Sequence, residues 1–194
     1  MNYLAHLYLS DNTVESRLGN FLGDFVRGDE RKKVDPTLEA GIVRHHRIDT
    51  FTDSHAQTAI SRKRIDTIKY RHLSGVLVDV FYDHFLAKHW ADYSTQPLDD
   101  FAQEIYRTFS AYKGYLPRMA RFVIGRMAAE QRLESYREVR GIDEALYRIA
   151  YRLKRPDIIQ GAVSELVANY DGLEADFRLF FPDLKAHIFS DQSP

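Results

Sequence analysis

Hydrophobic residues recur along this chain at intervals of three and four positions, and the strict alternation typical of half-buried strands is absent. The spacing therefore predicts helices along the whole chain. A length of 194 residues is typical of one domain. We expect an all-α fold, a single domain over residues 1–194 that forms a bundle of about eight to ten helices.

Local signals set the expected helix limits. Gly28 fits a C-terminal cap and Pro36 fits a first helical turn, while Pro156 and Pro182 are each expected to end the helix before them. One or two helical turns are expected within residues 1–9, and one further turn at 184–189. The longer helices are expected at about 14–26, 36–53, 56–69, 73–90, 98–112, 117–132, 141–154 and 159–181.

Residues 73–90, LSGVLVDVFYDHFLAKHW, are apolar on nearly every side of a helix. Such a helix is expected at the centre of the fold and largely buried. It nevertheless carries Asp79 and Asp83, which are four residues apart and share a face with apolar neighbours.

Two carboxylates within an apolar surface are unfavourable to ionise unless cations or donors meet them. They can cap neighbouring helices, pair with an arginine, or bind a metal ion. The presence of two acids at an i, i+4 spacing, with His84 beside them, favours the metal site.

Two further segments place similar pairs near apolar faces. Asn20 and Asp24 are four residues apart in one, and His45 and Asp49 are four residues apart in the next. Each pair alone has an ordinary explanation, a solvated helix face for the first and an internal hydrogen bond for the second. Together with the acids of 73–90 they favour a single carboxylate-rich site, suited to Mn²⁺, Fe²⁺ or Mg²⁺.

Some residues are expected to contact the metal ligands and orient them without touching the metal. Asn20 can hold a ligand, Asp53 lies one turn beyond the His45/Asp49 pair, and His84 can orient a ligand or bond a neighbour. His6 sits on the apolar opening segment, where a lone histidine is usually a satisfied core residue, although it could reach the site.

Composition narrows the chemistry. The chain has no cysteine, so disulfides, thiolate metal sites and cysteine nucleophiles are excluded, and a metal must take histidine, carboxylate or water. A formal net charge of −1 provides no global attraction to nucleic acid or to an anionic membrane. No run of about 20 apolar residues predicts a membrane span, and the sequence contains no Walker loop, no dinucleotide-binding glycine motif and no serine-hydrolase elbow.

Four segments of the first ninety residues carry a family resemblance: MNYLAHLYL at 1–9, GNFLGDFVRG at 19–28, GIVRHHRIDTFTD at 41–53 and LVDVFYDHFLAKHW at 77–90. Together and in this order they resemble the bacterial acyl carrier protein phosphodiesterases, a family regarded as a divergent relative of the HD-domain metal phosphohydrolases. The resemblance continues more weakly at 117–122 and at Tyr136.

The resemblance implies a divergent HD-like helical fold, a cytoplasmic location and a divalent metal, typically Mn²⁺. It implies removal of 4′-phosphopantetheine from holo acyl carrier protein, a reaction of fatty acid biosynthesis and lipid metabolism. The residues that match the family's motif positions are the expected metal-binding and catalytic residues: Asp24, His45, Asp49, Asp79 and Asp83. Ordinary HD enzymes have an adjacent His-Asp pair, whereas this chain has the order Asp83-His84, so their ligand geometry cannot be copied.

The implied substrate also predicts binding residues. Arg27, Arg44 and Arg47 are candidates to hold phosphate oxygens. The carrier protein is expected to be acidic, so a basic patch should steer its docking. The expected patch contains Arg62, Lys63 and Arg64, with Lys69 and Arg71 nearby.

Two other functions remain open at this stage. One is a related phosphohydrolase that acts on a small nucleotide or phosphate ester in a closed pocket. The other is a helical binding module that uses its buried acids for structure and catalyses no reaction. Metal in the purified protein would argue against the second.

Overall fold

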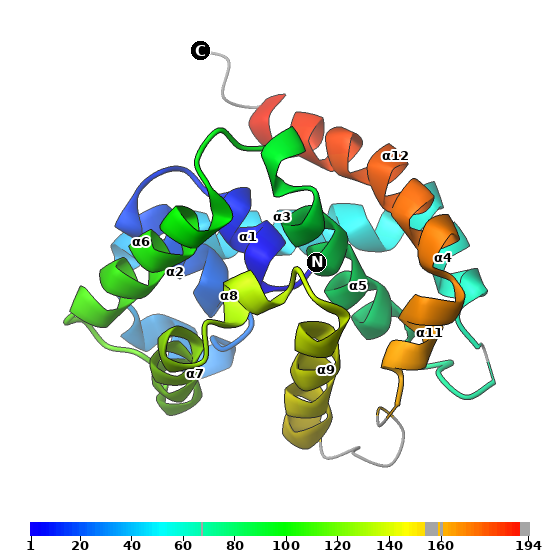
Figure 1. Ribbon diagram of the computed structural model, residues 1–194. Helices are drawn as coiled ribbons and strands as arrows, with labels where there is room; N and C mark the ends of the chain where they lie inside the picture. Colours follow the sequence, from blue (N-terminus) through cyan, green and yellow to red (C-terminus); the bar gives the residue numbers. More distant parts are fainter. Residues whose placement is uncertain (67, 154–158, 160, 191–194) are drawn as a thin grey trace.

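The computed structural model describes residues 1–66, 68–153, 159 and 161–190, and its elements are helices joined by short connections (Figure 1). Short 3₁₀ helices lie at Gly28–Lys33, Pro36–Leu38 and Trp90–Asp92. The α-helices are α1 (Tyr3–Tyr8), α2 (Val14–Leu22), α3 (Glu39–Ser54), α4 (Ala56–Arg64), α5 (Ser74–Lys88), α6 (Leu98–Ala111), α7 (Arg118–Ala129), α8 (Arg132–Ser135), α9 (Val139–Leu153), α11 (Val163–Ala168) and α12 (Tyr170–Phe189).

The described residues contain no strand, and eight of their helices have seven residues or more. The predicted all-α fold is therefore confirmed. Among the helices that the structure describes, none is long and apolar enough to cross a bilayer.

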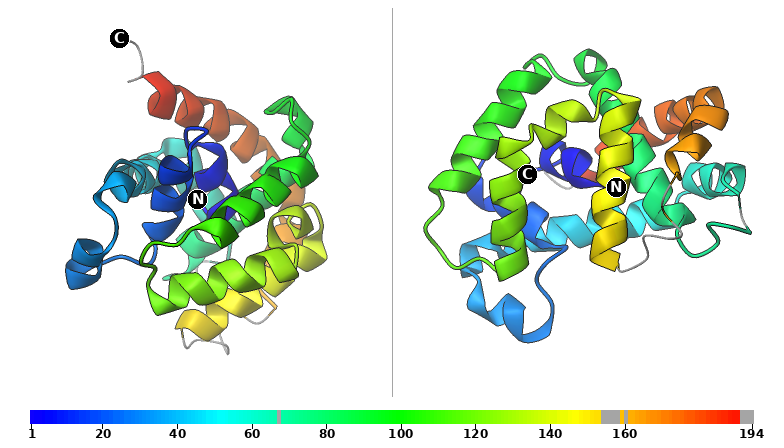
Figure 2. Two further views of the ribbon diagram at one scale, coloured as in Figure 1. Left: turned by 90° about the vertical axis from the view of Figure 1, so that its left-hand side faces the viewer. Right: turned by 60° about the horizontal axis from the view of Figure 1, so that its bottom comes forward.

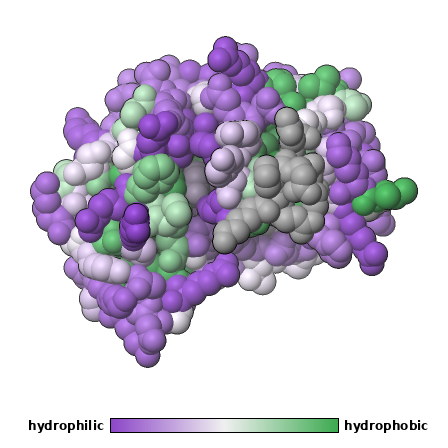
Figure 3. Space-filling view, turned by 90° about the horizontal axis from the view of Figure 1, so that it is seen from below, coloured by the Kyte–Doolittle hydropathy of each residue, from purple (hydrophilic) through white to green (hydrophobic). Residues whose placement is uncertain are grey.

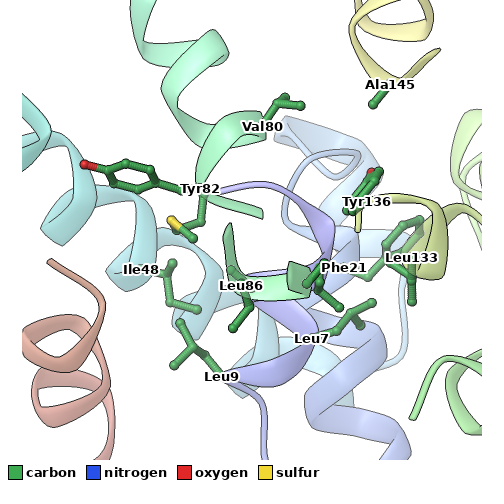
Figure 4. Packing of buried hydrophobic residues seen from close by; sticks show 14 of the residues in the cluster. Leu7, Leu9, Phe21, Ile48, Val80, Tyr82, Leu86, Leu133, Tyr136 and Ala145 are labelled. Carbon is green, nitrogen blue, oxygen red and sulfur yellow. The ribbon is translucent and has the colours of Figure 1, made fainter. Parts of the chain in front are cut away.

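Helix α5 occupies the centre of the molecule, as predicted for residues 73–90. Its buried residues face every direction around the helix axis, and it packs against α1, α4, α9 and α12. Leu86 and Tyr82 of α5 lie in the same core as Phe21 of α2 and Ile48 of α3 (Figure 4). Burial of these side chains supplies the main favourable free energy of folding.

Helices α2 and α3 cross at unusually close range because two glycines face each other. A Cβ at Gly41 would lie 2.8 Å from Cα of Gly19, and a Cβ at Gly19 would lie 2.3 Å from the carbonyl oxygen of Leu38. Only residues without a side chain permit this approach. The crossing brings the segment that holds Asn20 against the segment that holds His45.

The largest departure from the expected helix limits is at Pro182. A helix was expected to end before this residue, but α12 continues through it to Phe189. Pro182 is exposed, so the Arg178 carbonyl that lacks a helical donor can be hydrated. Phe181 and Leu184 on either side are fully buried, and this packing offsets the unfavourable proline.

Other limits differ by less. Helix α2 ends at Leu22, so Asp24 lies in the turn that follows and not on the helix. Helix α4 ends at Arg64 because Ile65 adopts an extended conformation that buries its side chain. The predicted helix over 159–181 is divided into α11 and α12, and the predicted end at Lys154 lies outside the described residues.

Helix α12 runs along the upper right of Figure 1 beside α4, and α7 and α9 lie at the bottom. The start of the chain, with α1, lies near the middle of that view. Seen with the bottom turned forward, α7 and α9 flank the position of α1 (Figure 2, right). The first residues of the chain are thus surrounded by helices from both of its halves.

Candidate active site

One aspartate joins two buried histidines where α1 and α3 meet. The Nε2 atom of His6 lies 3.1 Å from Oδ1 of Asp49, and the Nε2 atom of His45 lies 3.1 Å from Oδ2 of the same carboxylate. The two imidazole rings stack with their centroids 4.1 Å apart. We call His6, His45 and Asp49 the His–Asp cluster; within the described chain, one ligand atom from each residue lies within 4.8 Å of the others.

Hydrogen bonds fix the tautomer of His6. The amide nitrogen of Asn20 donates to the His6 carbonyl oxygen and to Ser10 Oγ, at 2.7 and 2.9 Å, so Oδ1 of Asn20 must face Nδ1 of His6, 2.9 Å away. An amide oxygen only accepts, so Nδ1 of His6 carries the hydrogen. In the neutral ring the lone pair is then on Nε2.

In the neutral ring this lone pair faces two oxygen atoms, which are themselves acceptors. Nε2 of His6 lies 3.1 Å from the Met1 carbonyl oxygen as well as 3.1 Å from Asp49. Burial, with the nearby His45 ring, lowers the pKa of His6, which favours the neutral ring. A lone pair that faces two oxygens is the arrangement that a bound cation would satisfy.

Asp49 is ionised in this environment. Burial alone would raise its pKa, but the contacts of its carboxylate with the His45 and His6 rings and the positive Met1 amino group nearby outweigh burial and lower the pKa. A carboxylate must be deprotonated to bind a metal ion, and the lowered pKa of Asp49 meets this requirement.

The position of His45 depends on a glycine. A Cβ at Gly23 would lie 2.2 Å from Cγ of the His45 ring, so the turn after α2 must have a glycine there for the ring to lie against it. The glycines of the GNFLGD segment therefore have separate roles, since Gly19 permits the helix crossing and Gly23 makes room for the imidazole.

Asp24 and Asp79 lie at the border of the His–Asp cluster. Oδ1 of Asp24 is 3.9 Å from Nε2 of His45. Oδ1 of Asp79 is 3.0 Å from the Met1 amino nitrogen, which is also 3.7 Å from Asp49. Burial alone would lower the pKa of this amino group, but the carboxylates of Asp79 and Asp49 raise it. A positive charge thus lies between two of the predicted site carboxylates.

Asp83 makes a different set of contacts. Its oxygens accept hydrogen bonds from the backbone N–H groups of Leu4 and Ala5, at 2.8 and 3.1 Å, so the carboxylate caps the N-terminal end of α1. Complete burial raises the pKa of Asp83 to about 7. The structure thus shows Asp83 in the capping arrangement, and its assignment as a metal ligand stays a prediction.

The predicted phosphate-binding arginines are not gathered at the His–Asp cluster. Arg44 forms a two-pronged ion pair with Asp11, at 2.9 and 2.7 Å. Arg47 donates to the His187 carbonyl oxygen at 3.4 Å. Arg27 is exposed on the loop after α2. Their roles in phosphate binding stay predictions.

The predicted docking patch is partly engaged within the chain. Arg62 pairs with Asp53, and Arg64 donates to the buried carboxylate of Asp176 at 2.7 and 3.1 Å. Lys63 is exposed between them. Asp53 is thus an ion-pair partner of Arg62 at the surface, and its supporting role at the site stays a prediction.

His84 also lies away from the cluster. Its ring nitrogens are each 2.8 Å from an oxygen, the Tyr136 carbonyl at Nδ1 and the Tyr170 hydroxyl at Nε2. These contacts connect α5 to α12 and to the segment after α8, which gives His84 a structural role.

Sequence reasoning underrated His6 and did not include Arg152. His6 was expected only to support the site, yet it is a member of the His–Asp cluster. Arg152 of α9 donates to the Tyr3 hydroxyl at 3.0 Å and lies 3.9 Å from Asp24. No local motif marks Arg152, because its partners come from the opposite end of the chain.

The chain resembles known proteins over nearly its whole length. Residues 1–184 match the family described as Acyl carrier protein phosphodiesterase. Relatives of that name are 34% identical over 185 residues in Serratia proteamaculans (strain 568) and 32% identical over 185 residues in Yersinia pestis, each covering 95% of both chains. Another, from Escherichia coli (strain K12 / DH10B), is 35% identical over 192 residues and covers 96% of both chains. No solved structure matches.

The fold and the site define an all-helical protein with a cluster of two buried histidines and one partly exposed carboxylate. Within that class, the chain belongs to the acyl carrier protein phosphodiesterase family. The predicted family resemblance is thereby confirmed. The relationship to HD-domain enzymes stays a prediction.

Proposed function

We propose that this protein hydrolyses the phosphodiester that links 4′-phosphopantetheine to the serine of holo acyl carrier protein. Two findings support the proposal, the membership of the family named for this activity and the presence of the His–Asp cluster within its motif segments. The observation that carries it is the single Asp49 carboxylate that meets both imidazole Nε2 atoms at 3.1 Å.

The donor set suits a divalent metal. His6, His45 and Asp49 would hold it, with Asp24 and Asp79 as neighbouring carboxylates. Two imidazoles with carboxylate oxygens suit Mn²⁺ or Fe²⁺, and we favour Mn²⁺, with Mg²⁺ as an alternative. Such an ion supplies positive charge for the phosphate oxygens and acidifies water.

Other residues of the chain orient the proposed metal ligands and provide a group for proton transfer. Asn20 holds His6 in one tautomer, and Gly23 leaves room for the ring of His45. Asp24 is about one-third exposed, so it can reach substrate, and it is the group best placed to move a proton to or from the serine oxygen.

Metal dependence provides the test. Protein treated with a chelator should lose the ability to remove the 4′-phosphopantetheine arm from holo carrier protein, and added Mn²⁺ should restore it, as followed by the intact mass of the carrier protein. Activity that survives complete removal of divalent metal would contradict the proposal. Cleavage of small nucleotides or phosphate esters, with the carrier protein untouched, would favour the rival phosphohydrolase instead.

A further inference from the structure

A large cavity lies between α7 and α9, next to the start of the chain. Its volume is about 770 Å³, and Asn2 and Tyr3 line it together with residues of both helices. A cavity of this size is typical of sites for small organic ligands or cofactors. The proposed chemistry at the His–Asp cluster does not by itself account for it.

The walls of this cavity are mainly apolar, yet they are open to solvent. Met119 and Phe122 of α7, and Tyr147 and Tyr151 of α9, line it and are each more than half exposed. Hydrophobic atoms gather on the face of the molecule seen from below, where they are bordered by hydrophilic ones (Figure 3). Exposed apolar side chains grouped around a hollow indicate a binding surface.

The cavity is connected to the candidate active site through Arg152. This residue lines the cavity, donates to the Tyr3 hydroxyl at 3.0 Å and lies 3.9 Å from Asp24. Asp24 is in turn 3.9 Å from His45 of the His–Asp cluster. The guanidinium of Arg152 thus stands between the apolar walls and the proposed metal ligands.

A second arginine on α9 lacks a full set of partners. Nη2 of Arg148 is buried and has no hydrogen-bond partner among the described residues, and its ion contacts with Glu130 and Glu144 are both long, at 3.9 Å. A buried donor without a partner is uncommon and indicates a missing ligand or water. The cavity therefore offers apolar walls and a buried guanidinium donor at Arg148, with Glu130, Asp143 and Glu144 also in its lining.

We propose that this cavity binds the pantetheine arm of the substrate, with the phosphate at Arg152 and the chain extending outward between α7 and α9. The inference rests on the proposed function and adds where the arm lies. The arm matches the cavity in chemistry, because it has a phosphate at one end and a long uncharged chain with a dimethyl group beyond it. The phosphate is placed next to Asp24 and the His–Asp cluster, where the diester must be cleaved.

Binding measurements with two ligands distinguish the contribution of the phosphate from that of the uncharged chain. Isothermal titration would use 4′-phosphopantetheine and pantetheine, which lacks the phosphate, and would measure both dissociation constants for the wild-type protein. Phe122→Asp and Tyr147→Asp place a charge in the apolar walls, so each should raise both constants about tenfold or more. Leu179→Asp is the matched control, because Leu179 on α12 is 64% exposed, close to the 62% of Phe122 and Tyr147, and does not line the cavity; it should change neither constant.

Arg152→Gln tests the orientation of the arm. It should raise the dissociation constant of 4′-phosphopantetheine about tenfold, because a charged hydrogen bond to phosphate is lost, and leave that of pantetheine unchanged. Arg152→Lys should recover part of the affinity. A purely structural role for Arg152 would weaken both ligands alike, and that result would overturn the orientation.

The binding test does not depend on hydrolysis. If the wild-type protein cleaves holo carrier protein but the α7 and α9 variants bind both ligands as tightly as Leu179→Asp does, the cavity assignment is wrong and the proposed function stands. If the protein binds 4′-phosphopantetheine with the predicted pattern but cleaves no carrier protein, the proposed function is wrong and the cavity assignment stands. Absence of binding by the wild-type protein would overturn the cavity assignment.

Discussion

The region around α1 and α3 differs from the region between α7 and α9 in how its polar groups are satisfied. In the first, His6 is held by Asn20 and meets Asp49, so the side chains position one another across helices. In the second, Arg148 has a buried nitrogen without a partner in the described chain, and aromatic side chains stand exposed around a cavity. This difference is the reason that we propose a reactive centre in the first region and a ligand site in the second.

The largest expected effect comes from removing the shared carboxylate of the first region. Asp49→Asn should lower kcat for holo carrier protein by on the order of 10³-fold and reduce bound metal, because the negative oxygen that meets each imidazole is lost. Metal analysis and kinetics would be measured together. Asp53→Asn is the control, because Asp53 lies one turn further along α3 and, among the described residues, forms its ion pair with Arg62 at the surface. A fully active, metal-loaded Asp49→Asn protein would refute the role of the His–Asp cluster.

Adding a methyl group at one glycine of each region should have opposite effects on stability. Gly23→Ala would place a Cβ 2.2 Å from the His45 ring, so it should lower the free energy of unfolding by about 1–3 kcal/mol and lower kcat by roughly 10²-fold through a displaced ring. Gly125→Ala on α7 meets no atom within 4 Å and should stabilise the protein by about 0.5–1 kcal/mol. Urea unfolding and kinetics measure both, and equal behaviour of the two variants would contradict the packing argument.

A third region shows what a purely structural carboxylate does. Asp176 is buried, and although burial raises its pKa, hydrogen bonds from Arg64, Ser61 and Gln57 outweigh burial and lower it. Its stabilisation is therefore fully present above the ordinary carboxyl pKa of 3.8 and is lost as the pH falls through the lower folded value.

Asp176→Asn should accordingly reduce the free energy of unfolding at pH 7 by about 1–3 kcal/mol, and the difference from wild type should shrink below the ordinary carboxyl pKa. Activity at pH 7 should be unchanged. Urea unfolding at neutral and acidic pH is the measurement. A difference that does not depend on pH would show that the charge of Asp176 contributes no stability.

The smallest effect is expected at the predicted docking patch. Since Arg62 and Arg64 are engaged in ion pairs, Lys63 is the residue best suited to test it. Lys63→Glu should raise KM about twofold at low salt, with kcat unchanged, and the effect should fade as salt increases. Lys113→Glu, an exposed lysine after α6, is the control. Equal KM values for the two variants at low salt would place docking elsewhere.

The helices could be predicted because burial on one side imposes a periodicity that the sequence displays directly. The burial of α5 followed from its apolar residues, and the i, i+4 spacing of His45 and Asp49 placed both on one side of α3. Pro182 misled the prediction because its effect on a helix is local, while the packing of Phe181 and Leu184 that offsets it is tertiary.

The candidate site was harder to predict, because its members meet only after folding. The sequence favoured metal binding over helix capping for Asp83, and it could not reveal the capping contacts, because the two N–H groups that donate to Asp83 belong to α1. The roles of His6 and Arg152 depend on their contacts with residues of other helices and turns, Asp49 for His6 and Tyr3 and Asp24 for Arg152. The sequence placed His6 only in a supporting role and gave no signal for Arg152, because the partners of both residues come from distant parts of the chain.

The most direct test of the central claim is the fate of isotopic label when holo carrier protein is cleaved in H₂¹⁸O. If water attacks phosphorus at the His–Asp cluster, one ¹⁸O should appear in the phosphate of released 4′-phosphopantetheine, and the carrier protein should regain an unlabelled serine. Mass spectrometry of both products reads this out. Label in the serine, a dehydrated serine, or no cleavage at all would contradict the account.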